Sequence, residues 1–204
     1  MKQNLKIAIT GGIGSGKSLV SNFVESCGYP VIKSDDIAKE LMLKDESVKK
    51  NIIKAFGRES YNENGLNTKY LSQHVFCDPP EAERIEKINS IVHPPTIKKI
   101  EELSNKFFET HKIVFIESAL VYEAKIQKMF DFVVLIYSEE RIRIQRAMER
   151  NKVSEEVIRK RMVFQIPDYK KKERAHFVIE NNSTISELEK RTQFILNLLQ
   201  SLVK

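Results

Sequence analysis

Residues 8–20, AITGGIGSGKSLV, decide the fold of this chain. Within them, residues 11–18 match the phosphate-binding pattern G-x-x-x-x-G-K-[ST] at every position, after a short apolar run and before a helical pattern. Glycines let the backbone wrap closely enough to point several N–H groups at one anion, and the amino end of a helix adds partial positive charge. We therefore predict that a strand passes through this loop into a helix, and that the loop binds a nucleotide polyphosphate.

Two side chains of the loop have separate roles in this prediction. Lys17 is expected to reach the β- and γ-phosphates of ATP, and the Ser18 hydroxyl to bind Mg²⁺. The predicted nucleotide-binding residues of the loop are Gly12, Ile13, Gly14, Ser15, Gly16, Lys17, Ser18 and Leu19. A glycine-rich turn that binds nothing is the plain alternative, and the strand and helix patterns on either side argue against it.

The composition is that of an ordinary globular protein. The chain has 204 residues, 41% hydrophobic and 30% charged, which suits one domain with a sizeable insertion. No apolar run approaches the ~20 residues needed to cross a bilayer, and the first residues do not form a signal peptide. The only cysteines, Cys27 and Cys77, form no C-x-x-C pair. We expect a cytoplasmic protein with no membrane partner.

The net charge of +6 is concentrated in one segment of the chain. Residues 141–174 contain twelve Lys and Arg against five Asp and Glu, so the remaining residues are together close to neutral. The segment carries no known nucleic-acid motif, and concentrated positive charge suits a polyphosphate ligand at least as well. We therefore expect no nucleic-acid partner.

Short apolar, β-branched runs alternate with helical patterns, as in a parallel sheet whose two faces are both covered. The predicted strands are residues 5–9, 29–32, 112–118, 130–137 and 176–180. The final stretch, 184–203, predicts an amphipathic helix with these apolar positions near helical spacing: Leu188, Phe194, Ile195, Leu198 and Leu199. The elements together predict an α/β fold with a five-stranded parallel sheet and right-handed crossovers.

A long excursion, residues 43–111, separates the second and third predicted strands. Four stretches in it have helical patterns, broken at Gly57, at Gly65 and at the proline pairs 79–80 and 94–95, and none has the pattern of a strand. The predicted domains are a nucleotide-binding core of residues 1–42, 112–138 and 175–204, a helical acceptor domain of residues 43–111, and a basic lid of residues 139–174.

The loop leaves open whether the phosphoryl group goes to a small molecule, as in a kinase, or to water, as in a hydrolytic switch or motor. A GTPase switch needs a guanine-reading N-K-x-D segment, and the chain has none near its last strand. Glu117 ends the third predicted strand and suits the metal-linked position of a motor. A kinase needs a base beside the acceptor hydroxyl, cations around the phosphoryl group and a cover against water.

Carboxylates and one histidine are candidates on the acceptor side. Asp35 and Asp36 follow the second predicted strand, whose carboxyl end lies near the phosphate-binding loop in such sheets. A carboxylate there can accept the hydroxyl proton or help to hold Mg²⁺, and it also suits the N-cap of the next helix. His93 lies in the helical excursion, and a lone histidine is more often structural than functional.

Arginines supply the candidate cations. Arg143, Arg146 and Arg150 are three and four residues apart, so we expect them to share one face of a helix in the lid. The planar guanidinium suits phosphate oxygens, and a lid carrying such groups can neutralise charge in the transition state. The same pattern is also typical of a solvated cationic helix face.

The chain resembles the dephospho-CoA kinase family along nearly its whole length. Besides the loop ITGGIGSGKS, the matching segments are VIKSDDIAKELM, VFCDPPEAERIEKINSIVHPPTI, ALVYE, RAMERN with the later Gln165, and AHFVIENN. The loop alone is shared by a very large superfamily, whereas the ordered set of later segments is much more specific. The resemblance implies a P-loop core of the nucleoside-monophosphate-kinase type. It also implies that ATP phosphorylates the ribose 3′-hydroxyl of dephospho-CoA, the final step of coenzyme A synthesis. For the oligomeric state, on which the sequence carries no signal, we favour a monomer.

The resemblance also implies roles for single residues. The second aspartate of the family's D-A-D motif falls on Asp35, which is therefore the expected catalytic base. Lys17 and Arg146 are expected to stabilise the transferred phosphoryl group. The remaining candidates are His93 and Arg143 for substrate binding, and Asn181 and Asn182 for the adenine side of the ATP site.

Three residues within the matching segments differ from the family pattern. Lys33 stands where the D-A-D motif has its first aspartate, and Ala119 and His176 stand where the family has proline and aspartate. A kinase for a nucleoside or a sugar is the nearest alternative function. A hydrolytic P-loop switch or a nucleic-acid-binding ATPase is the alternative from another class.

Overall fold

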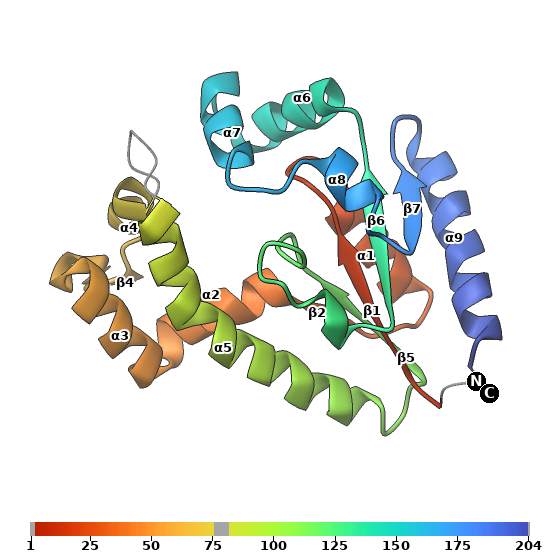
Figure 1. Ribbon diagram of the computed structural model, residues 1–204, viewed down its shortest axis with the longest axis horizontal. Coiled ribbons are helices and arrows are strands. Elements are labelled where there is room, and N and C mark those ends of the chain that lie inside the picture. The colour runs from red at the N-terminus through yellow and green to blue at the C-terminus, as the bar shows by residue number, and fades with distance from the viewer. Residues whose placement is uncertain (1–2, 76–81, 204) are drawn as a thin grey trace. The chain divides into compact units, whose positions relative to one another are not determined.

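The computed structural model describes residues 3–75 and 82–203, and its central feature is one parallel sheet (Figure 1). In chain order its strands are β1 (Leu5–Thr10), β2 (Val31–Lys33), β5 (Ile113–Glu117), β6 (Phe132–Tyr137) and β7 (Phe177–Glu180). They lie side by side in the order β2-β5-β1-β6-β7, and every neighbouring pair is parallel. The predicted five-stranded parallel α/β fold is confirmed, and all five carboxyl ends meet at one edge of the sheet.

The strands are continuous apolar runs because both faces of the sheet are covered. Ile7 in β1 and Val114 and Ile116 in β5 are completely buried. The second strand begins at Val31, two residues later than predicted. Pro30 has no N–H to donate to the sheet, and only its carbonyl takes part, accepting from the Phe115 N–H at 2.9 Å.

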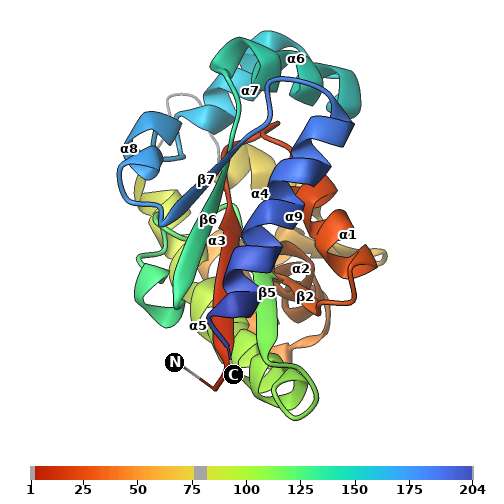
Figure 2. The same cartoon turned by 90° about the vertical axis from the view of Figure 1, so that its right-hand side faces the viewer.

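Two helices lie side by side against one face of the sheet, α1 (Lys17–Ser26) and α9 (Ile185–Ser201) (Figure 2). The buried stripe of α9 consists of Leu188, Thr192, Leu196 and Leu199. The predicted apolar face is wrong at Phe194 and Leu198, which are 68% and 38% exposed. Each of them lies two residues beyond a buried position, and a step of two residues turns a side chain to another side of a helix.

The segment predicted as a lid belongs to the same compact unit as the sheet, residues 1–33 and 103–204. Its helices are α6 (Glu140–Asn151), α7 (Glu155–Met162) and α8 (Asp168–Lys172). α6 and α7 pack against each other through Ile144, Ala147 and Ile158, and Ile13 of the glycine-rich loop joins the same apolar cluster.

A second compact unit comprises residues 34–102. Its helices are α2 (Ser34–Lys44), α3 (Glu46–Phe56), α4 (Thr68–Val75) and most of α5 (Ala82–Phe107). Its own core is built from Val48, Ile52, Leu71 and Val92. α3 begins where the Asp45 side chain caps two N–H groups at 2.9 Å, and it ends before Gly57, as predicted.

The prediction that this region has no strand is wrong. β3 (Tyr61–Asn62) and β4 (Gly65–Leu66) form a two-stranded antiparallel hairpin, preceded by the short 3₁₀ helix η1 (Arg58–Ser60). The Asn64 N–H donates to the Asn62 side chain at 2.9 Å, and Gly65 has φ +100°. These are turn features, but two residues per strand are too few to produce a visible alternation in the sequence.

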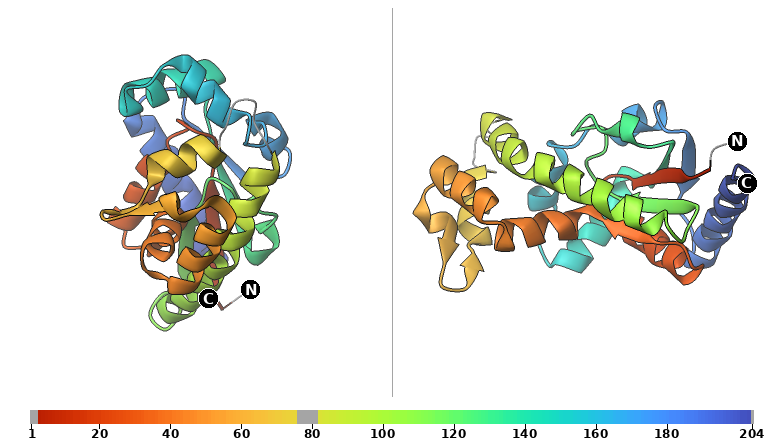
Figure 3. Two further views of the ribbon diagram at one scale, coloured as in Figure 1. Left: turned by 90° about the vertical axis from the view of Figure 1, so that its left-hand side faces the viewer. Right: turned by 90° about the horizontal axis from the view of Figure 1, so that it is seen from below.

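The predicted break at Pro94–Pro95 is also wrong, because α5 runs through both prolines without interruption (Figure 3). Val92, Thr96 and Ile100, four residues apart, are all buried, and the Thr96 hydroxyl donates to the Val92 carbonyl at 2.7 Å. This packed stripe outweighs the hydrogen bonds that the prolines cannot donate. Within the described parts of the chain no helix is both long and apolar enough to span a membrane. The predicted break at residues 79–80, and Cys77, lie outside the described residues.

Candidate active site

The loop between β1 and α1 is closed by its own backbone and by the Lys17 side chain. The Ser15 N–H donates to the Gly12 carbonyl at 3.2 Å. The Lys17 ammonium donates to the carbonyls of Gly11 and Gly12 at 2.9 and 3.1 Å. α1 begins at Lys17, after Gly16 in the left-handed conformation with φ +98°, so the loop sits at a helix amino end as predicted. Converging backbone N–H groups and an ammonium are what binds a polyphosphate.

A hydroxyl and a carboxylate meet beside the loop. Ser18 lies in the first turn of α1 and donates from Oγ to Glu117 Oε1 at 3.0 Å. Glu117 is the last residue of β5, and it is paired in register with Ile9 of β1 and Lys33 of β2. Two oxygen ligands at the carboxyl ends of neighbouring strands suit a hard cation such as Mg²⁺. No cluster of three or more His, Cys, Asp or Glu side chains suited to a metal occurs among residues 3–75 and 82–203.

Lys33 does not point its charge at this hydroxyl and carboxylate. Its ammonium pairs with Glu25 at 3.0 Å and contacts the Asn22 side chain at 3.4 Å, both on α1. The charge reversal relative to the family motif is therefore balanced by a partner of opposite sign on the neighbouring helix.

Asn181 fastens the loop from the end of β7. Its side chain is 3% exposed and donates from Nδ2 to the Ser15 carbonyl at 2.8 Å. A Cβ on Gly16 would collide with the same Nδ2, so the loop and Asn181 pack more closely than any other residue at position 16 permits. Asn182 accepts hydrogen bonds from the Ser138 hydroxyl and from the Glu139 N–H. Of the two residues predicted for the adenine side, Asn181 thus contacts the phosphate-binding loop, whereas Asn182 contacts the segment between β6 and α6.

The three arginines of α6 have three different surroundings, although they were expected to share one face. Arg143 is buried, Arg146 is half-buried and Arg150 is exposed. Arg146 donates from Nη1 to the Asn181 carbonyl at 2.9 Å and lies 3.4 Å from the Ser138 hydroxyl. The structure therefore brings Arg146 to the loop between β7 and α9, within the same group of residues as the glycine-rich loop.

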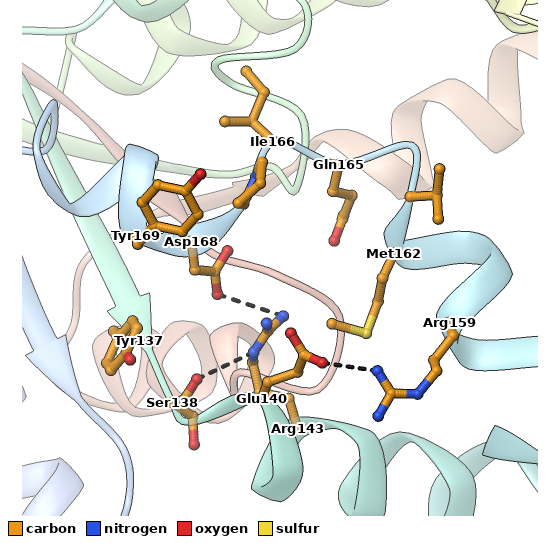
Figure 4. Close-up of a pocket in the computed structure, with 12 residues that line it drawn as sticks. Tyr137, Ser138, Glu140, Arg143, Arg159, Met162, Gln165, Ile166, Asp168 and Tyr169 are labelled. Atoms are coloured by element: carbon orange, nitrogen blue, oxygen red, sulfur yellow. Dashed lines mark hydrogen bonds and ion pairs between the residues drawn. The ribbon is translucent and has the colours of Figure 1, made fainter. Parts of the chain in front are cut away.

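Arg143 is surrounded by protein groups. It is 6% exposed, and it donates from Nε to the Ser138 carbonyl at 3.1 Å and from Nη1 to the Ile13 carbonyl at 3.5 Å. The Asp168 carboxylate lies 3.5 Å from the same Nη1. Figure 4 shows the guanidinium between Ser138 and Asp168. Asp168 was not a predicted site residue, and an aspartate at the start of a lysine-rich stretch gives no signal of this contact.

A cavity of about 570 Å³ adjoins these contacts. Its walls come from the end of β6, from α6 and from residues 159–169 (Figure 4). Gln165 reaches from this wall to the loop, where its side-chain oxygen accepts the Ile13 N–H at 3.0 Å. Leu19 is 48% exposed on the outer side of α1 and is not a lining residue of this cavity.

A second buried ion pair holds α8. The Lys171 ammonium is completely buried and lies 2.8 Å from Glu123, which follows β5. The same carboxylate oxygen accepts the Ile166 N–H at 2.9 Å. Sequence reasoning missed this pair, because its two residues are far apart in the chain and the lysine belongs to a run of charges.

The candidates on the acceptor side belong to the second compact unit. Asp35 and Asp36 are exposed and lie in the first turn of α2. The alternative that they cap this helix is wrong, because α2 already begins at Ser34. Asp36 makes a surface pair with Lys39 at 3.6 Å. His93 is half-buried in α5, and burial lowers its pKa below the ordinary value.

Comparison with known proteins gives a family model that covers most of the chain. The model described as dephospho-CoA kinase matches residues 5–187. A dephospho-CoA kinase of Fusobacterium nucleatum is 35% identical over 188 residues, which are 92% of this chain and 94% of the relative. A dephospho-CoA kinase of Chlorobaculum tepidum is 32% identical and covers 98% of this chain and 97% of its own length.

Solved structures resemble this fold over the same extent. A crystal structure of a Thermus thermophilus protein has a TM-score of 0.81 at 30% identity, covering 97% of this chain and 99% of that one. The dephospho-CoA kinase from Campylobacter jejuni has a TM-score of 0.68 at 24% identity and covers 95% of this chain and 96% of its own. At this identity the similarity supports the fold alone.

Proposed function

This chain belongs to the dephospho-CoA kinase family, and we propose that it transfers the γ-phosphoryl group of ATP to the ribose 3′-hydroxyl of dephospho-CoA. In this reaction the 3′-oxygen forms a bond to the γ-phosphorus, while the bond between that phosphorus and the β–γ bridging oxygen breaks. The hydroxyl proton passes to a protein base. The products are coenzyme A and ADP.

The observation that carries this proposal is the arrangement around the glycine-rich loop. The Lys17 ammonium donates to two loop carbonyls, and the Ser18 hydroxyl donates to Glu117 at the carboxyl end of β5. These are the groups that phosphoryl transfer requires around ATP, since its catalysis rests mainly on positioning and on neutralising charge. The adjoining cavity of about 570 Å³ offers room for a further part of a nucleotide.

Mg²⁺ fits the oxygen ligands at this edge of the sheet. Ser18 and Glu117 would hold it together with phosphate oxygens and water, as Mg²⁺ usually binds with few protein ligands. The ion supplies charge neutralisation at the β- and γ-phosphates when it is bound. Lys33 stands where the D-A-D motif of the family has its first aspartate, so position 33 supplies no carboxylate to the ion.

We assign the stabilisation of the transferred phosphoryl group to Lys17 and Arg146. Guanidinium carries five N–H donors, and the hydrogen bonds of Arg146 to described residues use only Nη1. The donors on Nε and Nη2 are thus available for phosphate oxygens. Anchoring one end of the side chain also reduces the rotamer freedom that it would lose on binding.

We assign the base to Asp35, at the start of the second unit. Its carboxylate lies in the first turn of α2 and can take the proton of the 3′-hydroxyl. His93, kept neutral by its lowered pKa, is the proposed contact for the uncharged parts of the acceptor. We further propose that the protein is a cytoplasmic monomer that acts without nucleic acid or membrane.

A substrate panel tests the function. The protein is mixed with ATP and Mg²⁺ and with dephospho-CoA, a nucleoside, a sugar or RNA, and ADP formation is followed by a coupled assay. We expect ADP only with dephospho-CoA, together with a product that mass and phosphorus NMR identify as the 3′-phosphate. Lys17→Ala should abolish this turnover. Stimulation by another acceptor, or by RNA alone, would overturn the proposal.

A further inference from the structure

We propose that Arg143 and Asp168 are a positioning pair that holds the phosphate-binding loop in shape, rather than groups that touch the substrates. The inference uses the nucleotide-binding role of the loop, and it adds a function for two residues outside the loop. It replaces the expectation from the sequence that Arg143 binds substrate.

The first observation is how thoroughly the Arg143 guanidinium is engaged. Its side chain is 7% exposed and that of Asp168 is 5% exposed, with 3.5 Å between Nη1 and the carboxylate. The Ser138 and Ile13 carbonyls accept from Nε and Nη1. Asp168 Oδ2 has no hydrogen-bond partner among the described residues, so the ion pair with Arg143 is what compensates its burial.

The second observation explains a glycine of the loop. The φ of Gly12 is not positive, so its backbone conformation does not demand glycine. A Cβ at this position would nevertheless collide with Arg143 Nη1 and would lie 2.9 and 3.0 Å from the two carboxylate oxygens of Asp168. An alanine at position 12 would therefore force the buried Arg143 guanidinium or the Asp168 carboxylate to shift.

The third observation is that the next two residues of the loop contact the same segment. The Ile13 N–H donates to Gln165, its carbonyl accepts from Arg143, and its side chain packs between α6 and α7. A Cβ on Gly14 would collide with the Arg143 carbonyl. Residues 12–14 thus rest against α6 and α8 through their backbone as well as their side chains.

The pair can position the loop because both of its members are themselves fixed. Asp168 opens α8, and Lys171 on the same helix is anchored by Glu123 at 2.8 Å. Arg143 is held through Nε by the Ser138 carbonyl at the end of β6. The loop is therefore held in place by two buried ion pairs, Arg143–Asp168 and Lys171–Glu123. If either pair is loosened, the loop N–H groups that face the phosphates shift.

The test compares Gly12→Ala in two backgrounds, the wild-type chain and the double variant Arg143→Ala/Asp168→Ala. The dissociation constant for ATP is measured by calorimetry, and Tm by thermal unfolding. In the wild-type background we expect Gly12→Ala to weaken ATP binding by about tenfold to 100-fold. In the double variant, where the colliding atoms are gone, its additional effect should be small. An equal loss in both backgrounds would mean that the nucleotide itself requires glycine and would overturn the inference.

Single variants separate positioning from direct contact and from stability. Asp168→Asn should raise the KM for ATP about tenfold and leave the KM for dephospho-CoA unchanged, because Asp168 acts only through the loop. If Arg143 contacted phosphate directly, Asp168→Asn would leave the KM for ATP unchanged, and the inference would fail. The volume-matched double variant Arg143→Met/Asp168→Leu removes both charges and should recover Tm relative to Asp168→Asn but not ATP affinity. Recovery of both would reduce the pair to a structural role.

Arg191→Ala is the matched control, because this exposed arginine on α9 donates to one backbone carbonyl, that of Glu180. It should change neither ATP binding nor Tm appreciably. ATP binding is measured without an acceptor. A wild-type protein that bound ATP but did not phosphorylate dephospho-CoA would therefore contradict the proposed function and leave this inference standing.

Discussion

Replacing Glu123 by glutamine tests how much the buried ion pair of α8 contributes to stability. The Lys171 side chain is completely buried and that of Glu123 is 13% exposed, with 2.8 Å between them. Glutamine keeps the shape of the side chain and an oxygen that can accept the Ile166 N–H. Glu123→Gln therefore removes the charge alone and leaves the ammonium buried without an anion.

The expected loss follows from this burial. Breaking a buried ion pair by removing one partner costs about 3–5 kcal/mol, since the remaining charge is uncompensated. A chain of this length loses about 2–4 °C of Tm per kcal/mol, so Tm should fall by about 6–20 °C. Differential scanning calorimetry without nucleotide is the assay, because it resolves separate transitions if the two compact units unfold apart.

Two further variants make the result decisive. Lys190→Met breaks a surface pair with Glu187, whose side chains are 71% and 45% exposed. Such a pair contributes about 0–1 kcal/mol, so Tm should fall by at most about 4 °C. Glu123→Gln/Lys171→Met removes both charges and should recover much of the loss. The reasoning is refuted if Glu123→Gln melts no earlier than Lys190→Met, or if the double variant is no more stable than Glu123→Gln.

Three other predictions concern the site. Asp35→Asn should lower kcat at least ~100-fold, the low end for loss of a general base, whereas Asp36→Asn should stay close to wild type; equal kcat values would remove Asp35 from this role. Glu117→Gln should raise the Mg²⁺ concentration for half-maximal activity about tenfold at fixed ATP, and an unchanged requirement would place the ion elsewhere than beside Ser18. Burial lowers the pKa of His93 in the folded protein. As pH falls, the imidazole is therefore protonated in the unfolded chain at a higher pH than in the folded chain. The free energy of unfolding is thus highest above about pH 6.5 and decreases as pH falls toward the pKa of the folded state. Tm should therefore drop more steeply on acidification in the wild type than in His93→Gln, and parallel curves would contradict this assignment.

The sheet and the loop could be predicted because their signals are local. Each central strand is a short apolar run, and residues 11–18 form one contiguous motif. The hairpin at residues 61–66 has strands too short to show alternation. The proline pair at 94–95 carries a strong local signal for a break, which the buried stripe along α5 overrides. The error at the prolines thus arises where tertiary packing overrides a local pattern, whereas the hairpin offers too little local pattern to detect.

The supporting residues of the site were harder to predict than the loop. In the sequence Arg143, Asp168 and Lys171 are members of a basic segment, and charge runs usually lie on solvated faces. In the fold all three are buried, because each meets a partner that comes from another element. A single sequence contains no signal of such pairing. Glu117 is an intermediate case: its position at a strand end was noticed, whereas its contact with Ser18 required the structure.

The contacts of the loop divide into those that can persist when ATP binds and those that must be exchanged. The hydrogen bonds of Asn181 and Gln165 to loop backbone groups come from two sides, and with the Arg143 contact they fix residues 12–16 in the folded chain. The Lys17 bonds to two loop carbonyls must give way if its ammonium is to reach phosphates. A glycine-rich loop loses much conformational entropy on ordering, and here that loss occurs on folding. ATP binding then requires mainly that the Lys17 side chain turns from the loop carbonyls to the phosphates. The favourable interaction free energy between the phosphates and the loop can therefore contribute to ATP affinity and to stabilising the transition state.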